Sequence, residues 1–153
     1  MLPITLVVAI AAAGLSGWLL IRLAHEGTPN SPNYAGAQRT EAKQKICAAV
    51  AVVRRGVSLN TNLQPAGGPE DITGTLAVAA NARLSLYDGG QYLLARLDPA
   101  TPPDLADAVT KFGNLLMDIG AGATAGQQNS EPEQTARLKD ADATNATIME
   151  LCK

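Results

Sequence analysis

Two cysteines are the residues in this chain best placed to react with each other. Cys47 and Cys152 are the only cysteines among 153 residues, and they lie at the two ends of the C-terminal part of the sequence. This placement predicts one disulfide, which would close a loop of about 100 residues and stabilise the domain by roughly 4 to 5 kcal/mol in the chain-entropy model. The alternative is a pair of buried free thiols. A disulfide indicates an oxidising compartment outside the cytoplasmic membrane.

No other residues have the spacing of a catalytic or cofactor site. The glycines of Gly120-x-Gly122-x-x-x-Gly126 are wrongly spaced for a dinucleotide loop, and they follow a predicted helix rather than a strand. Ser16 stands between glycines but lies inside an apolar run, unlike the serine of a nucleophile elbow. His25 is the only histidine, so no closed zinc site is expected; it is either a solvated linker residue or a group that titrates at the membrane surface. We therefore predict no enzymatic activity, no cofactor and no metal.

An apolar run at the N-terminus must position everything that follows it. From Leu2 to Leu23 no charged side chain precedes Arg22, and about 20 apolar residues are long enough to cross a bilayer as a helix. No Lys or Arg precedes the run and no A-x-A pattern follows it, which favours an uncleaved anchor over a signal peptide. Ala9, Ala13 and Gly17 recur four apart, either as a docking seam for another transmembrane helix or as a consequence of alanine-rich composition.

The charges and the cysteines give opposing predictions of orientation. Basic residues near the run lie only on its C-terminal side, which by the positive-inside rule would place the following domain in the cytoplasm. The rule is weak for long domains, and the predicted disulfide requires the outside. We therefore predict a single-pass protein of the cell membrane whose C-terminal domain is extracytoplasmic (periplasmic). Residues 1–25 form the transmembrane anchor, residues 26–37 a linker, and residues 38–153 the outer domain.

Apolar residues at helical spacing predict four helices in the outer domain. The first spans Gln38–Leu59, and its inner stripe contains Ile46, Val50, Val53 and Val57. The third has Thr101 as its N-cap and Pro102 at its first position. Its inner stripe contains Leu105, Val109, Phe112, Leu116 and Ile119.

The second helix is predicted to be interrupted by glycines. It opens at Asp71, a good N-cap, and runs from Ile72 to Tyr87, with a short continuation over Gln91–Leu97. Its inner stripe is predicted to contain Leu76, Ala80, Leu84 and Tyr87. The break at Asp88-Gly89-Gly90 either displays Tyr87 and Tyr92 to a partner or is a kink with both tyrosines packed inside.

The fourth helix completes the predicted fold. Ser130 begins it, with Glu133 completing a capping box. Its apolar seam contains Leu138, Ala141, Ile148 and Cys152. Asn145 falls on the same seam, so it is either a buried hydrogen-bonding side chain or a sign that the seam drifts. Together the patterns predict an all-α fold, an N-terminal transmembrane helix followed by a small antiparallel four-helix bundle.

Three segments of the outer domain carry a family resemblance. They are VRRGVSLNTN (Val53 to Asn62), AANARLSLYDGGQYLLARLDPATPPDLADAV (Ala79 to Val109) and the terminal LCK. In these segments the chain resembles alanine-rich, single-span envelope proteins of mycobacteria and related actinobacteria, a likeness that implies no assigned activity. By layout alone, one anchor plus a small outer domain, the chain is also similar to accessory subunits of the actinobacterial respiratory supercomplex, cytochrome bcc with an aa3 oxidase.

These observations lead to two hypotheses of function. The first is a non-catalytic accessory subunit that associates with an integral membrane protein complex of the envelope through its anchor and outer domain, in contact with membrane lipids. The alternative is a free-standing helical bundle that holds a lipid or other apolar small ligand, although an alanine-rich core disfavours a large pocket. A net charge of −2 and 3% aromatic residues argue against nucleic acid as a partner.

Overall fold

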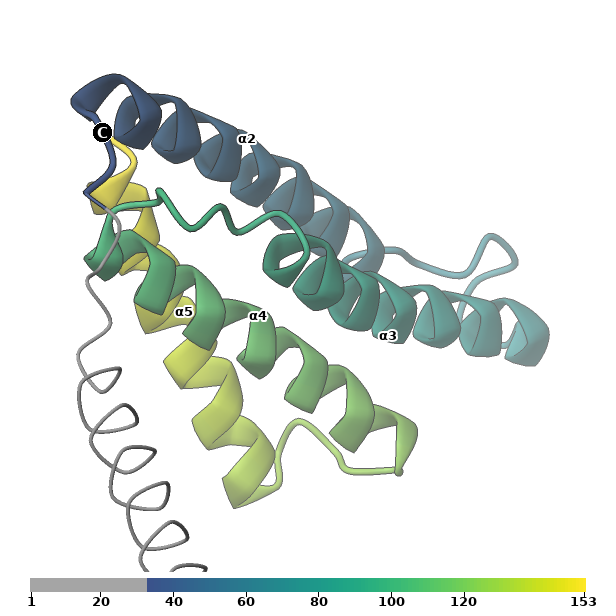
Figure 1. Cartoon of the computed structure of the whole chain (residues 1–153). Coiled ribbons are helices and arrows are strands. Elements are labelled where there is room, and N and C mark those ends of the chain that lie inside the picture. Colours follow the sequence, from purple (N-terminus) through teal and green to yellow (C-terminus); the bar gives the residue numbers. More distant parts are fainter. Residues whose placement is uncertain (1–32) are drawn as a thin grey trace, which may run out of the picture. The chain divides into compact units, whose positions relative to one another are not determined.

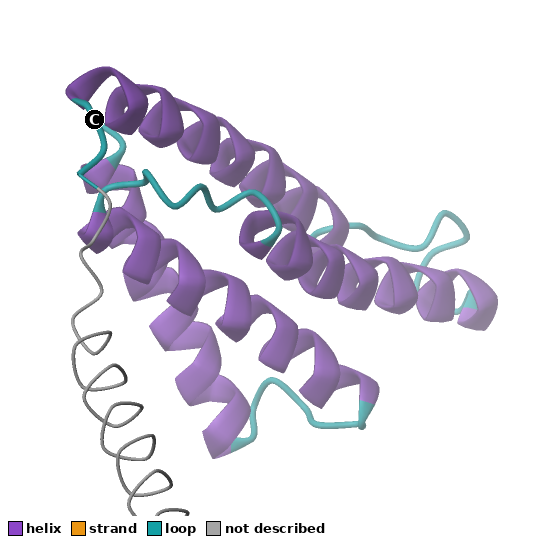
Figure 2. Cartoon of the chain, in the orientation of Figure 1, coloured by secondary structure: helices purple, strands orange, loops and turns teal. Residues whose placement is uncertain are grey.

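The computed structural model describes residues 33–153, and every regular element in this part of the chain is an α-helix. The helices are α2 (Gly36–Thr61), α3 (Ile72–Leu94), α4 (Pro103–Thr124) and α5 (Pro132–Leu151) (Figures 1 and 2). The predictions of an all-α class and of four helices are therefore confirmed for residues 33–153. None of these four helices is long and apolar enough to cross a membrane. The predicted anchor and its seam at Ala9, Ala13 and Gly17 lie outside the described residues.

The bundle is built from helices that pack in chain order. The extensive contacts are between α2 and α3, between α3 and α4, and between α4 and α5. Residues Tyr34–Lys153 form one compact unit. The five residues predicted to line the inner face of α4 are all buried, as are Ile46, Val50 and Val53 of α2. The α4 stripe was predictable because this helix presents one clearly apolar face at helical spacing. Helix α2 is less clearly amphipathic, since Val52 and Leu59 are also apolar and are exposed.

The structure corrects the prediction of a break in the second helix. Helix α3 continues through Asp88-Gly89-Gly90 without interruption, and both glycines are buried. A Cβ at Gly90 would lie 2.4 Å from the carbonyl oxygen of Gly113 on α4, and a Cβ at Gly89 would lie 2.8 Å from Cγ1 of Val53 on α2. The glycines are therefore the points where α3 approaches both neighbouring helices too closely for any side chain.

The predicted inner stripe of α3 is also wrong. Leu76, Leu84 and Tyr87 are 65%, 57% and 48% exposed. The residues of α3 that are buried are Leu86, Gly89, Gly90 and Leu93, which share the opposite apolar face at a three-four spacing. Helix α3 carries two apolar stripes, and the stripe that contains the glycines faces inward because it permits the close approach to α4 and α2.

The helix starts follow the prolines more closely than the predicted caps. Helix α4 begins at Pro103 with Pro102 as its N-cap, so Thr101 is a buried residue before the helix and does not cap it. Helix α5 begins at Pro132, and the predicted capping box from Ser130 is absent; Glu131 occupies the N-cap position instead. Proline is favoured at the first helical position because its missing N–H is not needed there. At α3 the predicted cap is confirmed, since Asp71 accepts a hydrogen bond of 2.8 Å from the Gly74 amide.

Candidate functional site

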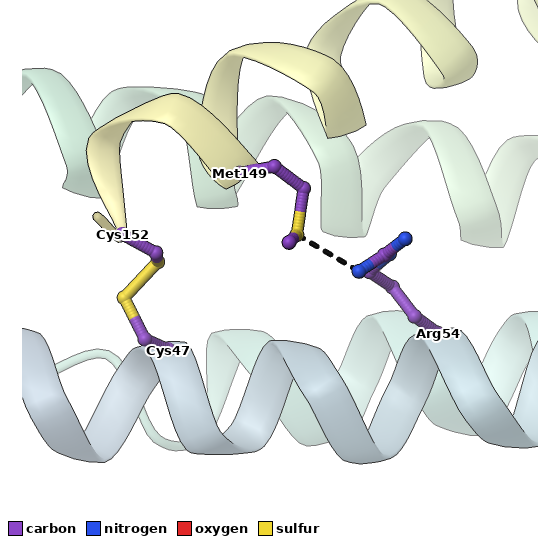
Figure 3. The surroundings of a disulfide bond; sticks show 4 residues. All are labelled: Cys47, Arg54, Met149 and Cys152. Atoms are coloured by element: carbon purple, nitrogen blue, oxygen red, sulfur yellow. Dashed lines mark hydrogen bonds between the residues drawn. A yellow bond between two sulfur atoms is a disulfide. The ribbon is translucent and has the colours of Figure 1, made fainter.

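One end of the bundle is closed by a covalent link between its first and last helices. Cys47 of α2 and Cys152, the residue that follows α5, form a disulfide with a Cα–Cα distance of 5.8 Å (Figure 3). The predicted disulfide is confirmed, and the described residues contain no free cysteine. Further along, Nη1 of Arg54 donates a hydrogen bond of 2.8 Å to Sδ of Met149 (Figure 3). The facing lengths of α2 and α5 are thus tied at two points, both near the C-terminal end of α5.

Beyond Arg54 a cleft of about 760 Å³ lies between all four helices. On α2 and its C-cap the cleft is lined from Arg54 to Asn62, and on α5 from Leu138 to Asn145, so Arg54 belongs both to the second tie and to the lining. Its apolar walls are formed by Val57, Leu86, Phe112, Leu116, Ile119 and Leu138. A volume of this size is typical of small-molecule sites. The prediction that an alanine-rich core disfavours a large pocket does not hold for this part of the bundle.

The polar lining of the cleft is biased towards positive charge. Arg54 and Arg83, both half-buried residues, line it, and the exposed residue Asp142 is the acidic residue in the same lining. Neither arginine forms an ion pair with any carboxylate among residues 33–153. An unpaired guanidinium beside an apolar wall is a ready donor for an anionic group.

Asn145 is the third polar feature of the lining. Its side chain is half-buried on the α5 seam, and Oδ1 is buried without a hydrogen-bond partner in the described structure. Neither of the alternatives drawn from the sequence describes it fully, because it lies on the seam and yet has no bonded partner for its oxygen. A buried acceptor left unbonded is costly unless water or a ligand supplies a donor.

A hydrogen-bond network fixes the turn that forms one edge of the cleft. Gln134 is fully buried, and its Nε2 donates 2.9 Å to the carbonyl oxygen of Ile119 at the end of α4. Arg137 donates to Oε1 of Gln127 at 3.0 Å and to Oε1 of Gln134 at 3.3 Å, and it also pairs with Glu133. The sequence offered one clue to Gln134, which precedes Leu138 by four residues and so extends the predicted α5 seam.

The glycines near this turn have structural roles. Gly126 adopts a positive φ of 93° just after α4, a conformation that favours glycine. A Cβ at Gly122 would lie 2.3 Å from Oε1 of Gln127, so only glycine leaves room for the network. Residues 33–153 contain no group of three His, Cys, Asp or Glu side chains that could hold a metal ion.

A second surface feature lies outside the cleft. The side chains of Ile72, Leu76, Leu84 and Tyr87 are exposed along α3, and we call this set the α3 outer face. A mainly apolar groove continues it, lined by Ala80, Arg83, Leu84 and Tyr87 of α3 and by Gly120, Ala121, Thr124 and Ala125 at the end of α4. At Gly120, α4 lies close to the backbone of α3, since a Cβ there would be 3.2 Å from the carbonyl oxygen of Arg83.

The two tyrosines of α3 have different surroundings. Tyr87 is half-exposed on the α3 outer face, whereas Tyr92 packs against the core with the guanidinium of Arg96 3.5 Å above its ring. Since α3 is not broken, the prediction that a break displays both tyrosines to a partner is wrong, and the alternative in which they pack inside holds only for Tyr92.

A surface ion pair lies elsewhere, on α2. The hydrogen bond and the charge of Glu41, 2.7 Å away, raise the pKa of the exposed Lys45 amine.

Comparisons with protein families, with curated proteins and with solved structures find no match to this chain. The site is therefore interpreted from its own geometry. It offers two features able to bind: the apolar cleft with an arginine-rich lining, and the α3 outer face.

Proposed function

We propose that this protein is a non-catalytic accessory subunit that is held in the cell membrane by residues 1–25 and docks on an integral membrane protein complex. In this proposal the helices form an antiparallel bundle on the extracytoplasmic side of the membrane. The observation that carries the proposal is the α3 outer face, where the side chains of Ile72, Leu76 and Leu84 are more than half exposed and Tyr87 is 48% exposed.

The α3 outer face has the composition of a docking surface. Contiguous exposed apolar side chains are uncommon on monomeric proteins and mark sites of association. Tyrosine is enriched among the residues that dominate binding energy at interfaces. The groove beside Gly120 gives the face a recess that a partner side chain can fill.

Because of the proposed anchor, a weak contact between the outer domain and its partner is sufficient for stable association. A tether confines the outer domain to a thin layer beside the membrane, where its effective concentration towards a neighbouring membrane protein is high. The layout similarity to accessory subunits of the respiratory supercomplex supports an assembly or stabilising role. We therefore expect the partner complex to keep its own chemistry when this chain is removed and to lose stability or yield.

Leu84 and Leu59 provide a matched test of the docking face. They are the same residue type with similar exposure, 57% and 60%, but Leu84 belongs to the α3 outer face and Leu59 lies on α2. Leu84→Glu places a charge within the proposed interface, so co-purification of the partner from native membranes should fall roughly tenfold or more. Leu59→Glu should leave recovery unchanged. Equal recovery with both variants would contradict docking through this face.

The cleft favours a second candidate function, the free-standing bundle that holds an apolar ligand. Its walls are apolar and its volume of about 760 Å³ is sufficient for a small molecule. Native mass spectrometry after mild extraction separates the two functions. A bound lipid-like mass with no protein partner supports the ligand-binding bundle, and a protein partner with an empty cleft supports the accessory subunit.

A further inference from the structure

We infer that the cleft binds an anionic amphiphile with a single long hydrocarbon chain. This inference rests on the second candidate function, ligand binding within the bundle, and adds the chemical class of the ligand. Three observations define that class: apolar walls, two unpaired guanidinium groups in the lining, and the position of the cleft at the end of the bundle that no covalent link closes.

The walls require a hydrocarbon. Leu86, Phe112, Leu116 and Ile119 form the deep part of the lining and are almost fully buried. These residues come from α3 and α4, which approach each other closely at Gly90 and Gly113. The cleft lining also includes residues of α2 and α5, so the cleft lies between these helices and the α3–α4 pair. A volume in the range of cofactor-sized ligands accommodates one chain rather than the two of a bilayer phospholipid.

The polar lining requires a negative group. Arg54 comes from α2 and Arg83 from α3, so arginines of two different helices line the cleft, and Arg83 also borders the groove beside the α3 outer face. Neither has a carboxylate partner among residues 33–153, and the polar contact of Arg54 is the thioether of Met149, a weak acceptor. A carboxylate or phosphate would accept charge-assisted hydrogen bonds that this sulfur cannot match. The single acidic group of the lining, Asp142, is exposed.

The closed end of the bundle limits how the ligand enters. The disulfide holds α2 against α5 on one side of the cleft. Entry is therefore from the opposite side, past the α4–α5 turn at Gln127, Gln128 and Asn129, which also line the cleft. Asn145 supplies a buried oxygen without a hydrogen-bond donor inside the same cleft, which a ligand hydroxyl or a water carried with the head group can satisfy.

The test uses the full chain in phosphatidylcholine nanodiscs, so that no detergent competes for the cleft. A palmitate bearing a chain-borne diazirine is photocrosslinked, and the adducts are mapped by peptide mass spectrometry. We expect adducts on the peptide that contains Phe112, Leu116 and Ile119. Unlabelled oleate should displace the probe at about tenfold lower concentration than oleyl alcohol, which has the same chain and no charge.

Variants of single arginines test the charge requirement. Arg54→Gln and Arg83→Gln should each weaken oleate competition by about tenfold, and Arg54→Lys should restore most of it. Arg55→Gln is the matched control, because Arg55 is exposed, adjacent on α2 and outside the cleft lining. Circular dichroism melting verifies that each variant is folded. Arg83→Gln tests the charge requirement independently, because it leaves the Arg54–Met149 contact in place.

The outcomes separate the ligand class from the candidate function. Equal displacement by oleate and oleyl alcohol, or no effect of either arginine variant, overturns the anionic amphiphile while leaving ligand binding in place. Absence of any adduct within the cleft overturns both. Displacement by oleate supports a free fatty acid as the source, and stronger displacement by oleoyl-lysophosphatidylglycerol supports a membrane-derived anionic lipid.

Discussion

Replacing Gly90 with alanine is the sharpest test of how this bundle is assembled. A Cβ at Gly90 would lie 2.4 Å from the carbonyl oxygen of Gly113 and 2.6 Å from Cγ of Met117. Favourable contacts between heavy atoms begin near 3.5 Å, so both approaches are strongly repulsive. The Met117 side chain can rotate away, but the Gly113 oxygen belongs to the backbone of α4. The added methyl group must therefore push α3 and α4 apart.

The size of the effect is worked out by comparison with Gly56. A Cβ at Gly56 on α2 would meet no other atom within 4 Å. Gly56→Ala should thus gain only the helix preference of alanine, about 0.5–1 kcal/mol. Gly90→Ala gains the same preference but carries the overpacking cost of about 1–3 kcal/mol. The difference in unfolding free energy between the two variants isolates the overpacking term, and we expect Gly90→Ala to be the less stable by about 1–3 kcal/mol.

Urea unfolding of the full chain, followed by far-ultraviolet circular dichroism, measures this difference. Tryptophan fluorescence is unsuitable because residues 33–153 contain no tryptophan. The midpoint should fall for Gly90→Ala and rise for Gly56→Ala, with similar denaturant slopes. If Gly90→Ala proves as stable as Gly56→Ala, then α3 and α4 do not cross at Gly90 and Gly113, and the assignment of the inner face of α3 fails.

Two further predictions concern the ties that hold the ends of the bundle. Unfolded, unreduced protein should give no maleimide adduct at Cys47 or Cys152, and reduction should destabilise the fold by about 4 to 5 kcal/mol, as measured by urea unfolding with and without reductant; full labelling without reductant would exclude the disulfide. Gln134→Leu should cost about 1–3 kcal/mol, because it leaves the Ile119 carbonyl and Arg137 without their buried partner. The exposed substitution Gln128→Leu serves as its control, and an equal cost for both would show that the Gln134 network does not stabilise the turn.

Local sequence patterns determined much of this fold. Helix α4 has one apolar face, a proline start and no competing stripe, so Leu105, Val109 and Phe112 could be assigned to the core from spacing alone. The disulfide was predictable for a similar reason, since two cysteines at the two ends of a helical domain have only each other as partners. The α4 stripe follows from the local spacing of apolar residues, and the disulfide follows from the number and positions of the cysteines.

The cleft was beyond the reach of such patterns. Its lining comes from four helices and a turn, and no short segment contains more than a few of its residues. Arg54 and Arg83 each look like ordinary surface residues in sequence, and only the packing of α2 and α3 brings both to one space. Gln134 was missed because a glutamine on an apolar seam signals burial only once the Ile119 carbonyl it bonds is known.

Helix α3 shows where local information ends. Its sequence carries two apolar stripes, and leucine and tyrosine make the stripe of Leu76, Leu84 and Tyr87 appear the better core by hydrophobicity. The sequence by itself determined that α3 is an amphipathic helix, and that Asp71 begins it. Only the tertiary structure decided which stripe is buried, because the advantage of Gly89 and Gly90 exists solely where Val53 and Gly113 approach them. The close backbone contact between Gly90 and Gly113 requires the absence of a side chain on both residues, and that pairing is a property of the packed helices.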